Sequence, residues 1–242
     1  MLLGGLVGWQ LALRQGRKLS SGSETVSDAQ SKDRNIDPAQ LNFTQPLQWV
    51  AYAKAFEKSK QYDEAVAIYD RGLIHHPNDF RLWHERGLAL ALLQRFEEAI
   101  ESYDRAYKIK PTQSDLGHER GDALLQLGRY EEAIASLDVY LSYNPKSIHV
   151  LADRGYALYK LNRYEKALQV LNPLLNSNER DPNSKSHAHY YQIASLQELG
   201  ELEVALKSSQ TAMKLYSQEY FKAQNEALRQ KILESVEWFQ AH

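Results

Sequence analysis

The chain has 242 residues, with 29 Lys plus Arg against 31 Asp plus Glu, and 43% of the residues are hydrophobic. This balance is typical of globular proteins, so it excludes a wholly disordered chain and a multi-span membrane protein. The net charge of −2 argues against a general nucleic-acid binder. Cysteine is absent, which excludes disulfides, zinc–thiolate sites and thiol catalysis. All 15 tyrosines follow residue 51.

The N-terminus begins with a short apolar segment. Residues 2–13 are almost uncharged and are followed by basic residues up to Lys18. As a helix this stretch would be roughly 18 Å long, against about 30 Å of hydrocarbon. Two interpretations of residues 1–19 stay open: an anchor that keeps the rest of the chain on the cytoplasmic side of a membrane, and a mildly apolar leader. Residues 20–45 are polar without helical periodicity and predict a flexible linker.

From residue 46 the sequence repeats every 34 residues. Apolar residues at positions 4, 8, 11 and 14 of each repeat, and again at 17, 20, 21, 24 and 28, follow the spacing of a helix face, so each repeat predicts two helices. Four extra residues, Pro182 to Lys185, precede the last repeat. The five repeats are 46–79, 80–113, 114–147, 148–181 and 186–219. Position 20 is alanine in all of them: Ala65, Ala99, Ala133, Ala167 and Ala205.

Small residues recur where the two helices of a repeat would meet. Position 8 is alanine or glycine in the first four repeats, and an aromatic at position 17 stands beside the contact in most of them. With these features the repeats resemble tetratricopeptide repeats of the bacterial type over residues 46–219, about 70% of the chain. The resemblance implies an all-α, right-handed α-solenoid of five helix-turn-helix repeats. Residues 220–242 carry apolar residues on one helix face and predict a C-terminal capping helix.

Charged residues pair up between neighbouring repeats. Position 25 of one repeat and position 7 of the next are oppositely charged in three successive cases: Asp70 with Arg86, Asp104 with Arg120, and Asp138 with Arg154. In the fourth case both members change together, to Asn172 and Gln192. We therefore predict three inter-repeat ion pairs of bidentate geometry and one amide pair. The alternative is that both positions are solvated helix faces.

No pattern in the sequence predicts catalysis. A Gly-rich phosphate loop, a GxSxG elbow and an HExxH motif are all missing. His84 and His118 share position 5 of successive repeats, and helix axes about 10 Å apart would keep them from sharing one metal ion. We expect a protein that is not an enzyme, with no catalytic residue, no cofactor and no metal site.

The tetratricopeptide resemblance implies a concave groove lined by the first helices. At the groove positions of the family this chain has Lys54, Arg81, His84, Glu85, His118, Glu119, Asp122, Gln126, His149, Asp153, Tyr156, Tyr159, Lys160, Tyr190 and Tyr191. Four of these are tyrosines near the join of repeats four and five, and tyrosine is favoured in binding surfaces. They predict a site for a peptide with apolar anchors and basic flanks. Alternatively, half of these tyrosines serve the packing of the repeats.

These features together predict a scaffold or adaptor that binds a protein or peptide partner and no nucleic acid. Two alternatives stay open: a membrane-tethered assembly factor, similar to tetratricopeptide proteins with an N-terminal anchor, and a scaffold that associates with itself. Pro173 falls inside the second helix of repeat four and predicts a change in the path of the solenoid before repeat five.

Overall fold

The computed structural model describes residues 41–113, 115–177 and 182–215, together with residues 226 and 230. In these residues the regular structure is α-helical, without strands. They divide into unit 1, which ends at Gln113, and unit 2, which begins at Ser114. The segment 1–19, most of the linker 20–45 and nearly all of the predicted capping helix in 220–242 lie outside the described residues.

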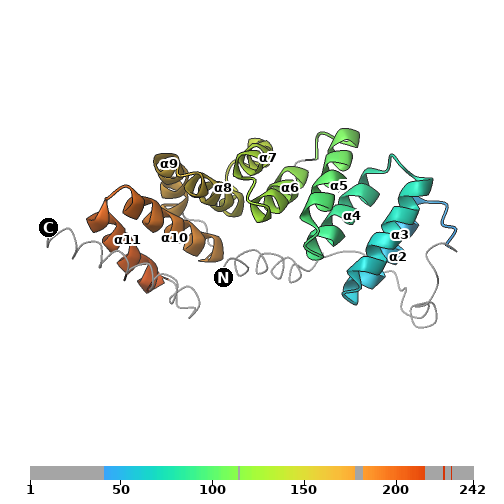
Figure 1. Cartoon of the computed structure of the whole chain (residues 1–242), viewed down its shortest axis with the longest axis horizontal. Coiled ribbons are helices and arrows are strands. Elements are labelled where there is room, and N and C mark those ends of the chain that lie inside the picture. Colours follow the sequence, from blue (N-terminus) through green and yellow to red (C-terminus); the bar gives the residue numbers. More distant parts are fainter. Residues whose placement is uncertain (1–40, 114, 178–181, 216–225, 227–229, 231–242) are drawn as a thin grey trace. The chain divides into compact units, whose positions relative to one another are not determined.

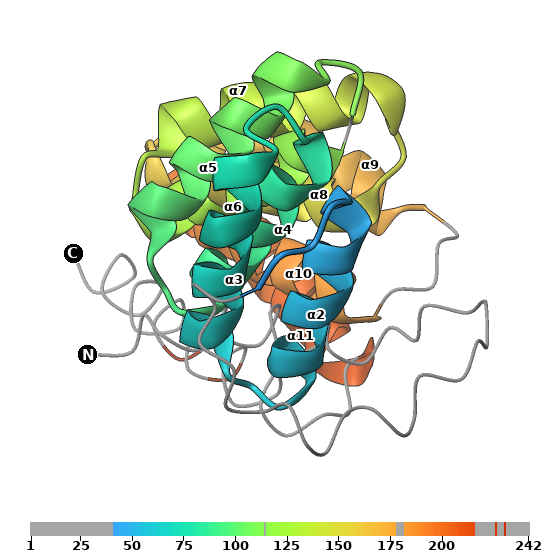
Figure 2. The same cartoon turned by 90° about the vertical axis from the view of Figure 1, so that its right-hand side faces the viewer.

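Unit 1 consists of two helical hairpins in its described part. The first pairs α2 (Pro46–Lys58) with α3 (Tyr62–His75), and the second pairs α4 (Phe80–Leu92) with α5 (Phe96–Ile109) (Figure 1). Each helix packs against the next along the chain, and α2 also contacts α4 (Figure 2). The carboxylate of Asp79 accepts the first free backbone N–H groups of α4, which begins the helix there.

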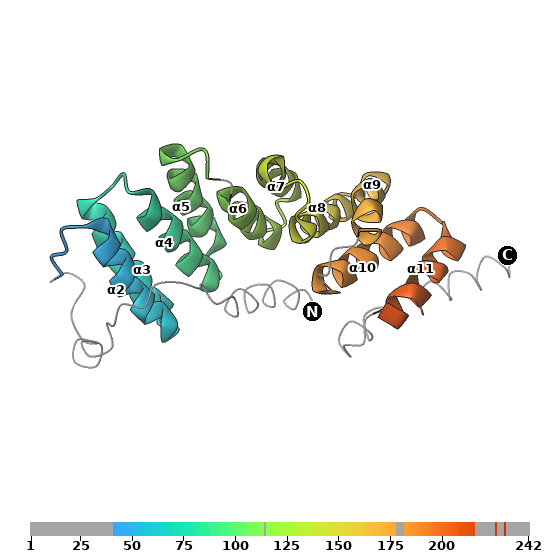
Figure 3. The same cartoon turned by 180° about the vertical axis from the view of Figure 1, so that it is seen from behind.

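Unit 2 continues the same pattern with three hairpins in its described part (Figure 3). They pair α6 (Asp115–Gln126) with α7 (Tyr130–Tyr143), α8 (Ile148–Lys160) with α9 (Tyr164–Leu175), and α10 (Pro182–Glu198) with α11 (Leu202–Leu215). The first helices of these hairpins are neighbours, because α8 contacts both α6 and α10. We call the surface that α6, α8 and α10 share the first-helix face.

The same backbone conformation ends the first helix of all five repeats. Position 15 of every repeat has a positive φ, at Lys60, Gln94, Gly128, Asn162 and Gly200. The N–H of the next residue then donates to the carbonyl five residues before it, as from Arg95 to Leu90 at 2.9 Å. This left-handed cap ends the first helix and turns the chain into the second. It gives every repeat the same hairpin even where position 15 is not glycine.

Repeats four and five depart from the regular pattern. The helix α10 begins at Pro182, so the four extra residues lengthen the first helix of repeat five instead of forming a loop. Pro173 lies inside α9, which ends two residues later at Leu175, whereas α3, α5 and α7 end at position 30 of their repeats. Proline removes a backbone hydrogen bond, which accounts for the shorter helix. The change in the path of the solenoid stays a prediction.

Glycine sets the distance between the helices of a hairpin. A Cβ at Gly121 would lie 2.5 Å from Cδ2 of Leu137, so the leucine occupies the space above the glycine. A Cβ at Gly117 would lie 2.7 Å from the carbonyl oxygen of Ser136 and 3.0 Å from the backbone nitrogen of Tyr140. At Gly117 the obstacle is therefore the backbone of α7, which cannot move as a side chain does.

This difference predicts unequal effects of two similar substitutions. Gly117→Ala should lower the free energy of unfolding by about 1 to 3 kcal/mol, because α6 and α7 must separate. Gly121→Ala should stay within about 1 kcal/mol of the wild type, because Leu137 can rotate and alanine favours the helix. Urea unfolding followed by circular dichroism measures both, and equal losses would contradict the interpretation.

Candidate functional site

The predicted groove residues of unit 1 bind one another. Lys54 forms ion pairs with Glu85 and, at 3.0 Å, with Glu57, whose other oxygen accepts a hydrogen bond of 2.8 Å from the Tyr69 hydroxyl. Burial lowers the pKa of Lys54, but the two glutamates outweigh it and leave this pKa raised. The ammonium stays charged, and the network joins α2, α3 and α4.

Two further groove residues of unit 1 have contacts within α4 and its cap. The Arg81 guanidinium lies 3.1 Å from the carboxylate of Asp79. The His84 ring stacks on Phe80, with centroids 5.6 Å apart and planes 17° apart. The polar groups of this part of the groove therefore stabilise unit 1 itself.

In unit 2 the four predicted tyrosines form one aromatic group. Tyr156 and Tyr159 on α8, with Tyr190 and Tyr191 on α10, are called the tyrosine zone below. Tyr191 is its centre, because the other three ring centroids lie 4.8, 5.5 and 5.2 Å from that of Tyr191, in the order Tyr156, Tyr159 and Tyr190. The zone bridges neighbouring first helices of the first-helix face.

The four tyrosines differ in burial. Tyr191 is 6% exposed and belongs to the core of unit 2, while the other three are partly buried and pack against that core. Burial raises the pKa of the Tyr190 phenol, and burial followed by a hydrogen bond to Tyr130 raises that of Tyr156. The zone thus combines one packing residue with three neutral phenols that keep a hydrogen-bonding hydroxyl. Tyr191 thus serves the packing of the repeats, and the interpretation of the other three as a binding surface stays a prediction.

Two histidines of the first-helix face meet in unit 2. The Nε2 atoms of His118 on α6 and His149 on α8 are 2.8 Å apart. Each histidine has an aspartate four residues later: Asp122 lies 3.4 Å from His118, and Asp153 lies 3.6 Å from His149. In the sequence, His118 shares position 5 of its repeat with His84. In the structure, His118 lies against His149, which is at position 2 of repeat four.

The remaining groove residues lie along the same face. Glu119 and Gln126 are partly buried on α6, and Lys160 is exposed at the end of α8. Together with the tyrosine zone and the histidines, they give the first-helix face of unit 2 an aromatic end near α10 and a polar end on α6.

The charged residues that join successive repeats lie close together within each unit. Arg86 Nε is 2.6 Å from Asp70 in unit 1, and Arg154 Nε is 2.6 Å from Asp138 in unit 2. The amides of Gln192 and Asn172 are 2.7 Å apart. Asp104 and Arg120 belong to different units. These contacts connect the second helix of one repeat to the first helix of the next.

For Arg86 and Arg154 the expected bidentate geometry is wrong, because each binds its carboxylate through Nε. Arg86 uses Nε for Asp70 and donates from Nη1 to the Ser102 hydroxyl at 2.7 Å. Arg120 reaches Ser136 in the same way at 2.6 Å, and the Ser208 hydroxyl donates to Gln192. The serines recur at position 23, a sequence signal that the analysis of charges missed. Repeat four has Val170 there instead.

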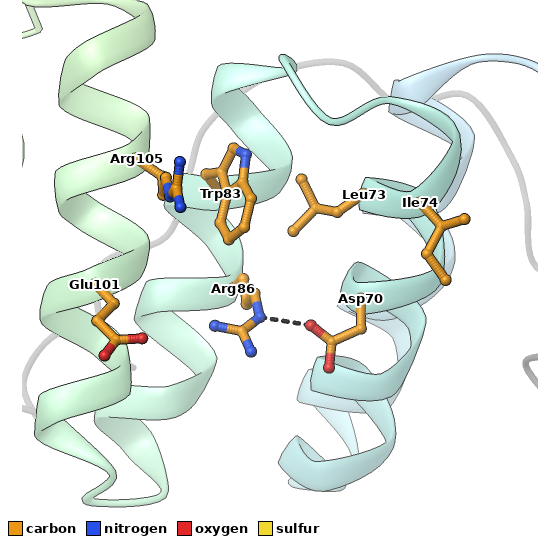
Figure 4. A pocket seen from close by; sticks show the side chains of 7 residues that line it. All are labelled: Asp70, Leu73, Ile74, Trp83, Arg86, Glu101 and Arg105. Atoms are coloured by element: carbon orange, nitrogen blue, oxygen red, sulfur yellow. Dashed lines mark hydrogen bonds and ion pairs between the residues drawn. The ribbon is translucent and has the colours of Figure 1, made fainter.

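A shallow pocket of about 380 Å³ lies beside the first of these pairs in unit 1 (Figure 4). It is lined from α3, α4 and α5 by Asp70, Leu73, Ile74, Trp83, Arg86, Glu101 and Arg105. Figure 4 shows the Trp83 ring between Arg105 and Leu73, with the Arg86 guanidinium directed at Asp70. The Arg86 guanidinium in this pocket is therefore already bound to Asp70 of the preceding repeat.

Family models for the tetratricopeptide repeat match residues 51–114, 90–152 and 124–186. These matches extend over more than half of the chain. The chain belongs to the tetratricopeptide repeat family. Its described residues have the helical hairpins of this family's α-solenoid, so the predicted fold class is confirmed. No curated protein sequence matches the chain.

Solved structures of other tetratricopeptide repeat proteins are similar. MamA from Desulfovibrio magneticus RS-1 is 17% identical with a TM-score of 0.65, and the match covers 72% of this chain and 96% of that one. YrrB, described as a tetratricopeptide protein with an unusual peptide-binding site, has the same identity and TM-score over 76% and 92% of the chains. MamA of MSR-1 is 20% identical with a TM-score of 0.61, over 70% and 95%. At such identities the likeness shows the fold alone.

The segment predicted as an anchor or leader, residues 1–19, lies outside the described residues. Among the helices that the structure does describe, none has both the length and the apolar character that crossing a bilayer requires.

The contacts of the two arginines predict that Arg86 contributes more to the stability of the fold than Arg154 does. Arg86→Met should lower the free energy of unfolding by about 1 to 2 kcal/mol, because it removes the partner of both Asp70 and Ser102. Arg154→Met should cost less than about 1 kcal/mol, because Val170 occupies the serine position and only the ion pair with Asp138 is lost. Urea unfolding measures both variants. An equal loss for the two would show that the serine contact adds nothing.

Buried His189 of repeat five predicts a pH dependence of stability. Burial lowers the pKa of His189 to about 4, below the ordinary value of 6.5. Between these values the unfolded chain binds the proton and the folded chain does not, so stability is full above pH 6.5 and falls as the pH decreases toward 4. From pH 7 to pH 5 the loss should be of the order of 1 to 2 kcal/mol.

The variant His189→Gln removes this titration. Chemical unfolding at pH 7 and pH 5 should show a smaller difference for His189→Gln than for the wild type. The control His75→Gln removes an exposed histidine and should keep the full difference. If both variants behave alike, His189 is not the source of the dependence.

Proposed function

We propose that this protein is a non-enzymatic interaction scaffold that binds a peptide or protein segment along its first-helix face. The tyrosine zone carries the proposal. Membership of the tetratricopeptide family supports the general role, since the repeats of this family are scaffolds for protein–protein interaction. The likeness of fold to YrrB, described as having a peptide-binding site, is compatible with it.

The tyrosine zone has the chemistry of an anchor site. Tyr156, Tyr159 and Tyr190 are partly buried around the fully packed Tyr191, so their rings are held in place before a ligand arrives. Rigid aromatic side chains bring apolar area and a hydroxyl at a low cost in conformational entropy. An apolar side chain of the ligand would lie on these rings, and the hydroxyls would bond to its backbone.

Charge around the zone indicates the flanks of the ligand. Glu198 on α10 raises the pKa of Tyr159, after the larger effect of burial, so its negative charge acts on the zone. Glu119 lies farther along the same face on α6. Lys160 is a basic residue on α8, the helix that carries Tyr156 and Tyr159. The balance favours a segment with an apolar anchor and basic residues next to it.

The test selects peptides from a displayed random library on the full chain and measures their affinity for variants. Tyr159→Ala combined with Tyr190→Ala removes two partly buried rings and keeps the core residue Tyr191. We expect the selected peptides to bind this double variant at least tenfold more weakly, because truncation of an anchor typically costs more than about 1 kcal/mol.

The matched control is Tyr107→Ala combined with Tyr143→Ala, which removes two tyrosines that are 40% and 58% exposed outside the zone. This control should bind as the wild type does. Peptides that bind both double variants equally, or that retain their affinity for the zone variant, would contradict the proposal. Light scattering of the same samples reports whether the chain associates with itself, which would favour a scaffold that uses this face for a second copy.

A further inference from the structure

Four side chains of unit 2 bring metal-binding atoms together on the first-helix face. On α6 and on α8 a histidine is followed four residues later by an aspartate, a spacing that places both side chains on one side of a helix. One ligand atom from each of His118, Asp122, His149 and Asp153 lies within 4.8 Å of every other. We propose that this group, the His–Asp cluster, binds a divalent transition-metal ion of the zinc class.

Three distances in the cluster can be compared with those of a tetrahedral site, and the remaining ones are at most 4.8 Å. Bonds of about 2.0 to 2.2 Å from zinc to nitrogen and oxygen place neighbouring ligand atoms about 3.3 to 3.6 Å apart. Within each helix the Nε2 to carboxylate distances are 3.4 Å on α6 and 3.6 Å on α8. The two Nε2 atoms, at 2.8 Å, must separate by about half an ångström. Small rotations of the two rings suffice for this change.

The two carboxylates of the cluster lie in a site of low exposure, where a cation interacts with them more strongly than in water. The side chains of Asp122 and Asp153 are only 16% and 11% exposed, and that of His118 is 11% exposed. His149, at 26%, is the most open of the four and provides the way in for an ion. Charged groups with so little contact with water are stabilised by a partner of opposite charge. A divalent cation balances both aspartates while both imidazoles stay neutral.

The equivalent positions in unit 1 hold residues of opposite charge. Asp122 and Asp153 occupy position 9 of repeat three and position 6 of repeat four. The equivalent positions of repeats one and two hold Lys54 and Glu85, which form an ion pair. Unit 1 therefore supplies the cation from its own chain, whereas unit 2 has an aspartate where the lysine would be. The metal ion takes the place of the lysine charge.

The donor set selects the class of ion. Two imidazole nitrogens and two carboxylate oxygens suit Zn²⁺, Co²⁺, Ni²⁺ and Cu²⁺, whereas Mg²⁺ and Ca²⁺ prefer oxygen ligands alone. Without metal, the 2.8 Å contact is a hydrogen bond in which one Nε2–H donates to the other Nε2. Metal binding requires a lone pair on both Nε2 atoms, with the ring protons on Nδ1. The hydrogen bond and the metal site therefore exclude each other.

The experiment uses the full chain, freed of metal by a chelator and dialysis, and adds Zn²⁺ alone with no peptide. Calorimetry at pH 7 should show one ion per chain, and saturating Zn²⁺ should raise the unfolding midpoint, because the ion binds only the folded site that joins α6 and α8. Since no peptide is present, this result is independent of the interaction proposed above.

Substitution of the two aspartates identifies the site. Asp122→Asn combined with Asp153→Asn keeps the shape and both histidines, and should weaken Zn²⁺ binding at least a hundredfold. The matched control Glu119→Gln removes a carboxylate from the same helix outside the cluster and should bind as the wild type does. If the double variant fails to fold, His149→Ala takes its place, because His149 is the most exposed member.

Three outcomes would overturn the proposal: no uptake of Zn²⁺ below millimolar concentration, unchanged affinity in the cluster variant, or equal weakening by Glu119→Gln. Proton NMR of the histidine rings gives a further check on the wild type. Zn²⁺ should shift the signals of His118 and His149 together, and shifts confined to other histidines would assign the ion to another place.

Discussion

Close approach of two helix backbones is the constraint on which every repeat of this protein depends. The alanine at position 20 is fully buried in all five repeats. Position 8 is small in the first four, so the side chain at position 24 fills the space above it, as Tyr103 does over Gly87. A residue larger than alanine at position 20 would hold the helices apart and expose the core. The small residues that this contact requires recur in the sequence with the 34-residue period.

With the inside of each hairpin settled by these positions, other positions vary without loss of the fold. Position 7, which faces the neighbouring repeat, is an example of such variation. Arg86 binds α3 and α5 from its place on α4, and Gln192 makes the equivalent amide contacts with Asn172 and Ser208. Charge is therefore not required at this place. What the place requires is a side chain long enough to reach both neighbouring helices, with hydrogen-bonding groups on both sides.

The helices could be predicted from the sequence because periodicity and small residues report local contacts directly. Contacts between repeats were harder, because neighbouring first helices are offset along their axes. Position 5 of repeat three meets position 2 of repeat four, so His118 lies against His149. The burial of Tyr191 likewise depends on α8 and α10 together, and no pattern within one repeat contains it. The extension of α10 back to Pro182 could not be predicted either, because the four extra residues have no counterpart in the other repeats.

The same offset gives the solenoid its chemical versatility. Positions 9 and 6 of consecutive repeats meet within each unit, with Lys54 and Glu85 in unit 1 and Asp122 and Asp153 in unit 2. The backbone supplies one geometry, and the side chains decide whether it holds an ion pair or a group of acids and imidazoles. Neither choice affects the packing at positions 8 and 20, so such a site can arise or disappear without a change in fold. Function in this chain must therefore be sought in the residues that the repeat does not require.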